Sequence, residues 1–327
     1  MRWGQWSLTL GYALLSLQAA SANAPDVNFG FGGFDRDEPI RITADALEAS
    51  DKDGERFLVF RDRVQVRQGP LELDANELEA LYGADANQPD ALEARGAVRV
   101  RDGARRAHCD EARYDRRAAT LVCRGNPARL WDGEDQLSGS AFHFDLETRQ
   151  VTVEGGTALE IHRELPGTEP GADDAEGDGD GPEREWLAEQ RDAGPVHIEA
   201  RSGRASDGDT ARRIAFEGDV VVRQGDLELR AQHLEAVYPA GATQPEQLLA
   251  RDAVEVRQAD REARCEEAEY RPAERWVACR GDAQLRDGRD ELEGDRIAFD
   301  LERRRVDIEG NARLWVHPAD HEEGGPE

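Results

Sequence analysis

The sequence is poor in positive charge, in lysine and in aromatic residues. Lys and Arg total 42 against 70 Asp and Glu, and the formal net charge is −28. This balance argues against nucleic acid or an anionic membrane surface as a direct electrostatic partner. Lys52 is the only lysine, aromatic residues make up 6% of the chain and hydrophobic residues 38%. The chain can therefore bury a core, but a thin one.

Sequence motifs for catalysis and for metal or nucleotide binding are also missing. The seven histidines form no cluster, and neither HExxH nor GxSxG occurs. The glycine-rich segment 30–33 follows no strand pattern and lacks the lysine of a phosphate-binding loop. Close pairs among 70 carboxylates arise by chance, so they do not support a carbohydrate-active β-helix enzyme. The sequence predicts a protein that is not an enzyme and that has no cofactor and no metal site.

The amino-terminal residues predict export. Residues 1–24 have the pattern of a signal peptide, with an apolar stretch from Trp6 to Leu17 and a cleavage site at Ala22-Asn23-Ala24. The residue immediately after the cleavage site is Pro25 and not a cysteine, which excludes a lipoprotein. No later segment approaches the ~20 apolar residues of a membrane-spanning helix. We expect a periplasmic protein whose residues 25–37 are a flexible, Gly- and Phe-rich segment.

The four cysteines come in two equally spaced pairs, Cys109 with Cys123 and Cys265 with Cys279. An oxidising compartment favours disulfides, and pairing within each pair is the simplest of the three connectivities. A zinc or redox site is the alternative. It has little support because there is no CxxC, and only His108 lies beside a cysteine.

The most informative feature that is present is an internal repeat. Ile42 matches Ile198, Tyr82 matches Tyr238, and the motif around Cys123 matches the one around Cys279. After a one-residue deletion the match continues, with Phe144 against Phe299. The internal repeat therefore predicts two copies of one fold. We place them at 38–162 and 195–317, with an acidic disordered linker at 163–194 and an acidic tail at 318–327.

Within each copy, apolar and polar residues alternate in short runs. Examples are Val64-Gln65-Val66, Val98-Arg99-Val100 and Val254-Glu255-Val256. Glycine, aspartate and asparagine separate the runs at intervals of about 8–12 residues, which is typical of an all-β sandwich, barrel or roll. A shorter repeat of about 30 residues inside each copy also suggests stacked layers of antiparallel strands.

The apolar positions of these runs have two interpretations. They are either an ordinary packed core or the lining of a groove that holds lipid chains, in which each buried methylene contributes about 0.8 kcal/mol. The candidate lipid-binding residues are Ile40, Ile42, Phe60, Val64, Val66, Leu71, Leu73, Val98, Phe144, Val196, Ile198, Phe216, Val220, Val222, Leu227, Leu229, Val254 and Phe299.

Several phrases, in this order and found twice, resemble the LptA/OstA-like family. They are Ile42-Thr43-Ala44-Asp45, the run from Phe60 to Gly69, Leu71 to Ala75, Glu111 to Asp115, and Gly125-Asn126-Pro127. The resemblance covers both copies. It implies that each copy is a twisted antiparallel β-jellyroll with a hydrophobic groove.

The resemblance also implies function and partners. Such domains stack end to end through open sheet edges, and they carry the acyl chains of lipid A between the inner and outer membranes. The implied partners are lipopolysaccharide, LptC-like inner-membrane and LptD-like outer-membrane components, and further copies of the chain. The fusion of two copies and the strong acidity depart from the familiar pattern. A periplasmic β-scaffold that carries nothing is the alternative.

Overall fold

The computed structural model describes residues 40–52, 55–83, 86, 88–162, 194–208, 210–242, 245–300, 303 and 305–317. The expected signal peptide, the segment 25–37, the acidic tail and nearly all of the linker lie outside the described residues. What is described contains strands, turns and bends but no helix. The all-β prediction is therefore confirmed.

The first sequence copy forms nine strands. They are β1 (Arg41–Thr43), β2 (Ala46–Lys52), β3 (Glu55–Gln68), β4 (Leu71–Tyr82), β5 (Ala91–Asp102), β6 (Arg105–Asp115), β7 (Thr120–Asp132), β8 (Asp135–Asp145) and β9 (Gln150–Ile161).

The second copy repeats the pattern. Its strands are β10 (Val196–Asp207), β11 (Ala211–Gln224), β12 (Leu227–Pro239), β13 (Gln247–Gln258), β14 (Arg261–Arg271), β15 (Trp276–Asp287), β16 (Asp290–Asp300), β17 (Arg305–Glu309) and β18 (Arg313–Trp315).

The alternation of apolar and polar residues in the sequence places every second side chain of a strand on the interior face of the sheet. In β5, Val98 and Val100 are buried, whereas Arg99 and Arg101 between and beyond them are exposed. This is the period of two that a strand imposes. Alanines fill many interior positions, and the largest fully buried side chains include Phe142, Leu130 and Ile297. The core is thin, as the composition predicts.

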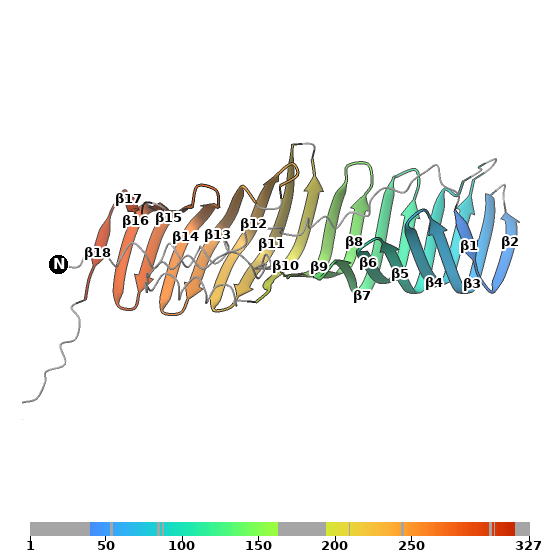
Figure 1. Cartoon of the computed structure of the whole chain (residues 1–327), viewed down its shortest axis with the longest axis horizontal. Helices are drawn as coiled ribbons and strands as arrows, with labels where there is room; N and C mark the ends of the chain where they lie inside the picture. Colours follow the sequence, from blue (N-terminus) through green and yellow to red (C-terminus); the bar gives the residue numbers. More distant parts are fainter. Residues whose placement is uncertain are drawn as a thin grey trace, which may run out of the picture.

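All eighteen strands belong to one antiparallel sheet. β1 and β2 both pair with β3, and each strand from β3 onward pairs with the next as far as β16. β17 and β18 both pair with β16. The successive strands lie side by side along one elongated molecule (Figure 1).

The two copies are joined by strand pairing. β9 pairs with β10 in an antiparallel register that runs from Ile161 opposite Val196 to Gln150 opposite Ser206. Ile161 and Val196, the strand residues that flank the segment 163–193 in the sequence, therefore lie opposite each other. The sheet continues from one copy into the other without a break.

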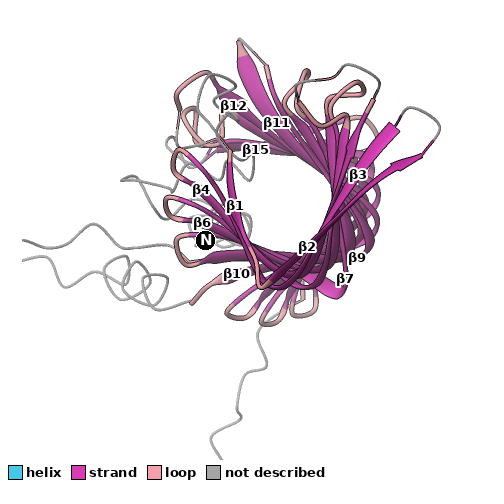
Figure 2. Ribbon diagram, turned by 90° about the vertical axis from the view of Figure 1, so that its right-hand side faces the viewer, coloured by secondary structure: helices cyan, strands magenta, loops and turns pink. Residues whose placement is uncertain are grey.

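A line of β-bulges bends the sheet. The register shifts once in every neighbouring pair from β3 to β16. On several strands, two consecutive residues at these shifts have positive backbone φ angles, for example Gly96 (φ 78°) and Ala97 (φ 50°). A Cβ on Gly96 would lie 2.7 Å from Asn76 Nδ2 of β4, so glycine fits this position best. Bulges bend and twist strands, and the sheet curls around its interior face (Figure 2).

The one-residue deletion between the copies falls at this bend. In β7, three residues (125–127) lie between the paired Arg124 and Ala128, and they include the cis Asn126–Pro127 bond. In β15 only Gly281 and Asp282 occupy the same gap. The bulge absorbs the difference, so the pairing on either side is the same in both copies.

Candidate lipid-binding interior and sheet edges

The apolar interior runs through both copies as one cluster of buried side chains. Most candidate lipid-binding residues belong to it. The buried ones are Val64, Val98, Phe144, Val196, Ile198, Phe216, Val220, Val222, Leu227, Leu229, Val254 and Phe299. In this conformation the neighbouring side chains fill the space beside them, as in an ordinary core.

The remaining candidates cluster at the amino-terminal end of the sheet. Ile42, Phe60, Val66, Leu71 and Leu73 are partly buried and pack against the same cluster. Ile40 is 41% exposed. These residues come from β1, β3 and β4 or from just before β1, at the end of the sheet where β1 and β2 are the last strands of the described residues. This end is the most accessible part of the candidate site.

The carboxy-terminal end of the sheet has an apolar surface that the sequence reasoning missed. Leu314, Trp315 and Val316 are all at least 43% exposed. Leu314 occupies the position of Leu159 in the first copy, and Leu159 is only 4% exposed because β10 pairs with β9. The internal repeat could have revealed this apolar surface. Leu314 matches a residue that is buried in the first copy, and no third copy follows it among the described residues.

Both cysteine pairs form disulfides within their own copy. Cys109 of β6 bonds to Cys123 of β7, and Cys265 of β14 bonds to Cys279 of β15, with Cα–Cα distances of 5.7 and 5.8 Å. All four cysteines are buried on the interior face. The predicted pairing is therefore confirmed. Among the described residues, no group of three or more His, Cys, Asp or Glu is placed to hold a metal ion.

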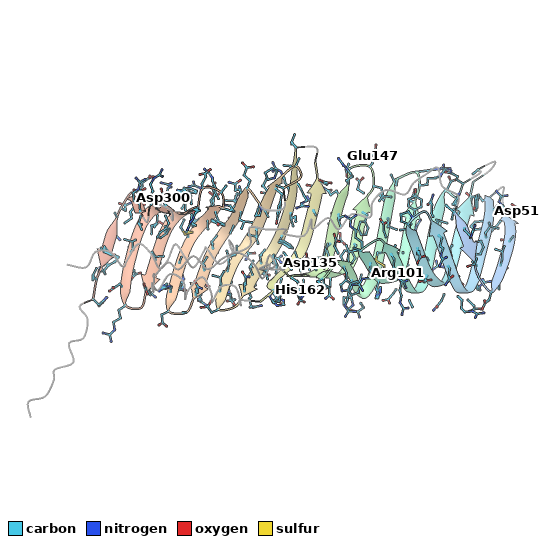
Figure 3. The ribbon with its side chains drawn as sticks, viewed as in Figure 1. Asp51, Arg101, Asp135, Glu147, His162 and Asp300 are labelled. Carbon is cyan, nitrogen blue, oxygen red and sulfur yellow. A yellow bond between two sulfur atoms is a disulfide. The ribbon has the colours of Figure 1, made fainter. Side chains whose placement is uncertain are left out.

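The joint between the copies contains a buried carboxyl group. Asp135, the first residue of β8, is 1% exposed and accepts a hydrogen bond from the backbone N–H of His162 at 2.7 Å. Its Oδ2 atom has no hydrogen-bond partner among the described residues. Figure 3 shows Asp135 and His162 together near the middle of the molecule. Burial raises the pKa of Asp135 to about 6, although the His162 N–H opposes the change.

This pKa makes stability depend on pH at the joint. A carboxyl group whose pKa is raised in the folded state stabilises the fold when protonated, and this stability is lost as the pH rises through about 6. Asp135→Asn keeps the acceptor oxygen and removes the charge. We expect it to raise the free energy of unfolding by about 2–3 kcal/mol at pH 8 and to change it little at pH 4. Urea unfolding at both pH values measures the difference.

Asp290 supplies a matched control. It has the same position in the second copy and accepts the His317 N–H at 2.7 Å, but its side chain is 20% exposed. Asp290→Asn should therefore change stability little at either pH. Equal gains in the two variants, or a gain from Asp135→Asn that persists at pH 4, would contradict the explanation by burial.

The fold and the candidate site together define a class of protein. Its members are built from a bent antiparallel sheet that has an apolar interior and two edges open to further strands. The model of the LptA/(LptD N-terminal domain) LPS transport protein family matches residues 41–150 and 197–305. The matches cover more than half of the chain, one in each copy. The chain belongs to this family and is a protein of the lipopolysaccharide-transport type. The predicted resemblance is confirmed.

Two further comparisons are more distant. An uncharacterized protein of Rhizobium meliloti is 26% identical over 152 residues, which are 44% of this chain and 80% of that protein. A crystal structure of LptH, described as the LptA-homologous periplasmic component of the lipopolysaccharide transport device of Pseudomonas aeruginosa, has 22% identity and a TM-score of 0.32. The similarity covers 38% of this chain and 87% of LptH. Among the described residues, no helix is long and apolar enough to cross a membrane.

Proposed function

We propose that this protein is a section of a periplasmic bridge for lipopolysaccharide, with lipid A acyl chains held against its apolar interior. The observation that supports it most is the continuity of that interior, because buried apolar residues follow each other from β3 to β16 across the joint between the copies. Near the joint, the buried polar side chains that such a path meets among the described residues are Asp135, Thr157, Arg212 and Gln224. Family membership supports the same function.

The open edges support the bridge. At the internal joint, Val196 lies opposite Ile161 and Ile198 lies opposite Leu159. The matching residues at the free ends are Ile40 and Ile42 on one side, and Val316 and Leu314 on the other. The two free edges thus carry complementary halves of a joint already present inside the molecule. LptC-like and LptD-like components, or a second copy, are the proposed partners for these edges.

The packing of the interior favours a second candidate function. Because most of the candidate residues are buried by their neighbours, the two halves of the bent sheet must separate before an acyl chain can enter beyond the amino-terminal end. A bridge scaffold that carries no lipid needs no such opening. The two functions predict different contacts with lipopolysaccharide.

Photocrosslinking distinguishes them. A photoreactive residue at Leu73, which is partly buried beside the cluster, should capture lipopolysaccharide in living cells. Gln65 is exposed on the adjacent strand β3 and provides the control on the outer face. We expect at least about tenfold more capture at Leu73, because apolar burial holds the acyl chains there.

A third position tests the opening of the sheet. Phe144 is 3% exposed, so capture at Phe144 would require the halves of the sheet to separate. Capture at Leu73 and Phe144 but not at Gln65 supports the carrier. If Leu73 captures no more lipopolysaccharide than Gln65, the carrier function is wrong and the scaffold remains.

A further inference from the structure

The outer face of the sheet mostly balances its charges across strands. Arg61 pairs with Glu48 of β2 at 2.8 Å, and Arg223 pairs with Glu228 of β12 at 3.0 Å. Opposite charges on neighbouring strands stabilise a sheet, and like charges directly opposite each other destabilise it. A cluster of like charges on this face therefore requires an explanation.

Such a cluster lies on β5, β6 and β7 of the first copy. Arg99 lies opposite His108, which lies opposite Arg129, and Arg101 of the next row lies opposite Arg106. All five side chains are exposed, and neighbouring strands are about 4.8 Å apart. These five residues are called the basic patch below. Arg101 is labelled in Figure 3.

The basic patch lacks counter-ions at its centre. Arg101, at its edge, pairs with Asp74 at 3.6 Å and Glu72 at 3.9 Å. Within the part of the chain that the structure describes, no carboxylate forms an ion pair with Arg99, Arg106 or Arg129. This concentration of positive charge is the more unusual because the chain carries a net charge of −28.

Trp131 holds part of the basic patch in place. The Arg106 guanidinium lies 5.7 Å from the centre of the indole ring, and the His108 ring meets the indole edge-on at 4.7 Å. The indole N–H donates a hydrogen bond to Gln136 Oε1 at 2.9 Å. Desolvation, together with the charges of the four arginines, lowers the pKa of His108. Trp131 thus holds Arg106 and His108 in place before any ligand binds.

The second copy shows that the fold does not need this arrangement. The matching rows of β13 and β14 contain Glu255, Arg257, Glu262 and Arg264. Arg264 pairs with Glu255 at 3.0 Å, and Arg257 pairs with Glu262 at 3.3 Å. The same backbone therefore carries a balanced network in one copy and an unbalanced patch in the other.

We propose that the basic patch is a binding site for phosphate groups, such as those on a saccharide headgroup, on the outer face of the first copy. Guanidinium groups bind phosphate through paired hydrogen bonds. Arg99 and Arg129 have this capacity available, since no carboxylate of the described residues uses it, and Arg106 uses one donor for a 3.5 Å hydrogen bond to the Gly133 backbone oxygen. The proposal goes beyond the proposed function, because it requires neither an open interior nor bound acyl chains.

The test uses the full chain and two phosphate probes without acyl chains, inorganic pyrophosphate and a bisphosphorylated glucosamine disaccharide. The variant Arg99→Gln/Arg129→Gln should bind both probes at least about tenfold more weakly than the wild type at 0.1 M salt. The matched control, Arg257→Gln/Arg264→Gln, removes the same charge from paired positions of the second copy. Its affinity should stay within about twofold of the wild type. Tighter binding of the disaccharide identifies a saccharide headgroup as the source of the phosphates, and tighter binding of pyrophosphate identifies free phosphate.

Two further readouts separate binding from folding. Removal of mutually repelling charges should leave the melting temperature of Arg99→Gln/Arg129→Gln no lower than that of the wild type. Saturation with phosphate should raise the pKa of His108 in an NMR titration, because a bound anion favours the imidazolium. Neither readout depends on lipid capture at Leu73. The phosphate-binding proposal can therefore be contradicted while the carrier function is supported, and the carrier function can be contradicted while phosphate binding is supported.

Two outcomes would overturn the proposal. The first is equal loss of affinity in the two double variants, which would indicate general electrostatics. The second is no binding of either probe by the wild type.

Discussion

Phe142→Ala is expected to lower the free energy of unfolding by about 3–5 kcal/mol, the usual cost of truncating a buried phenylalanine. Phe142 of β8 is 0% exposed. It lies opposite Cys123 of β7 and Val153 of β9, two further buried residues. The thin core offers few large side chains that could move into the cavity, so the loss should lie in the upper part of this range. Urea unfolding under oxidising conditions measures it.

Phe57→Ala is the matched control. Phe57 of β3 is only partly buried, and it lies between Ser50 of β2 and Leu81 of β4, outside the interior cluster. The same truncation there should cost less than half as much, because the side chain leaves no enclosed cavity. Equal losses for the two variants would show that the interior near Phe142 is not the closely packed core described above.

Replacement of Cys109 and Cys123 by serine is expected to lower the free energy of unfolding by about 3 kcal/mol. The disulfide closes a loop with a sequence separation of 14 residues, and the chain-entropy model gives about this value for such a loop. Cys265 and Cys279, with the same separation, should give a similar loss. Both pairs are buried, so the serine hydroxyls add a further cost.

A reductant provides the control for the disulfides. It should destabilise the wild type by about the sum of the two losses and leave a variant without cysteines unchanged. Because β9 pairs with β10 along ten residues of each strand, destabilisation of the first copy should also weaken the second. Unfolding of the second copy at an unchanged urea concentration would show that the shared sheet does not couple the copies.

Local patterns in the sequence were sufficient for the strands and the disulfides. Alternation such as Val98-Arg99-Val100 determines a strand with one buried face, because successive side chains of a strand point to opposite sides. Two turns of equal length bring Cys109 near Cys123 and Cys265 near Cys279. The repeat then extends both conclusions from one copy to the other.

The sequence also placed the candidate lipid-binding residues on one apolar face, and the structure brings most of them into one cluster. It could not decide whether they line an open groove. The alternation of apolar and polar residues in a strand does not reveal how far its side chains lie from those that face them across the bent sheet. For the same reason, the sequence did not show that Phe144 is buried while Leu73 is partly accessible.

By itself, therefore, the sequence determined the all-β fold, its duplication and the family, and it favoured the cysteine pairing that the structure shows. The tertiary structure alone decided features that depend on register between strands. Pairing of β9 with β10 unites the copies, whereas no strand of the described residues pairs with the outer edge of β18 and Leu314 is exposed. Register also brings Arg99, His108 and Arg129 side by side from three strands. Residues far apart in a chain become neighbours only when hydrogen bonds between strands set their alignment.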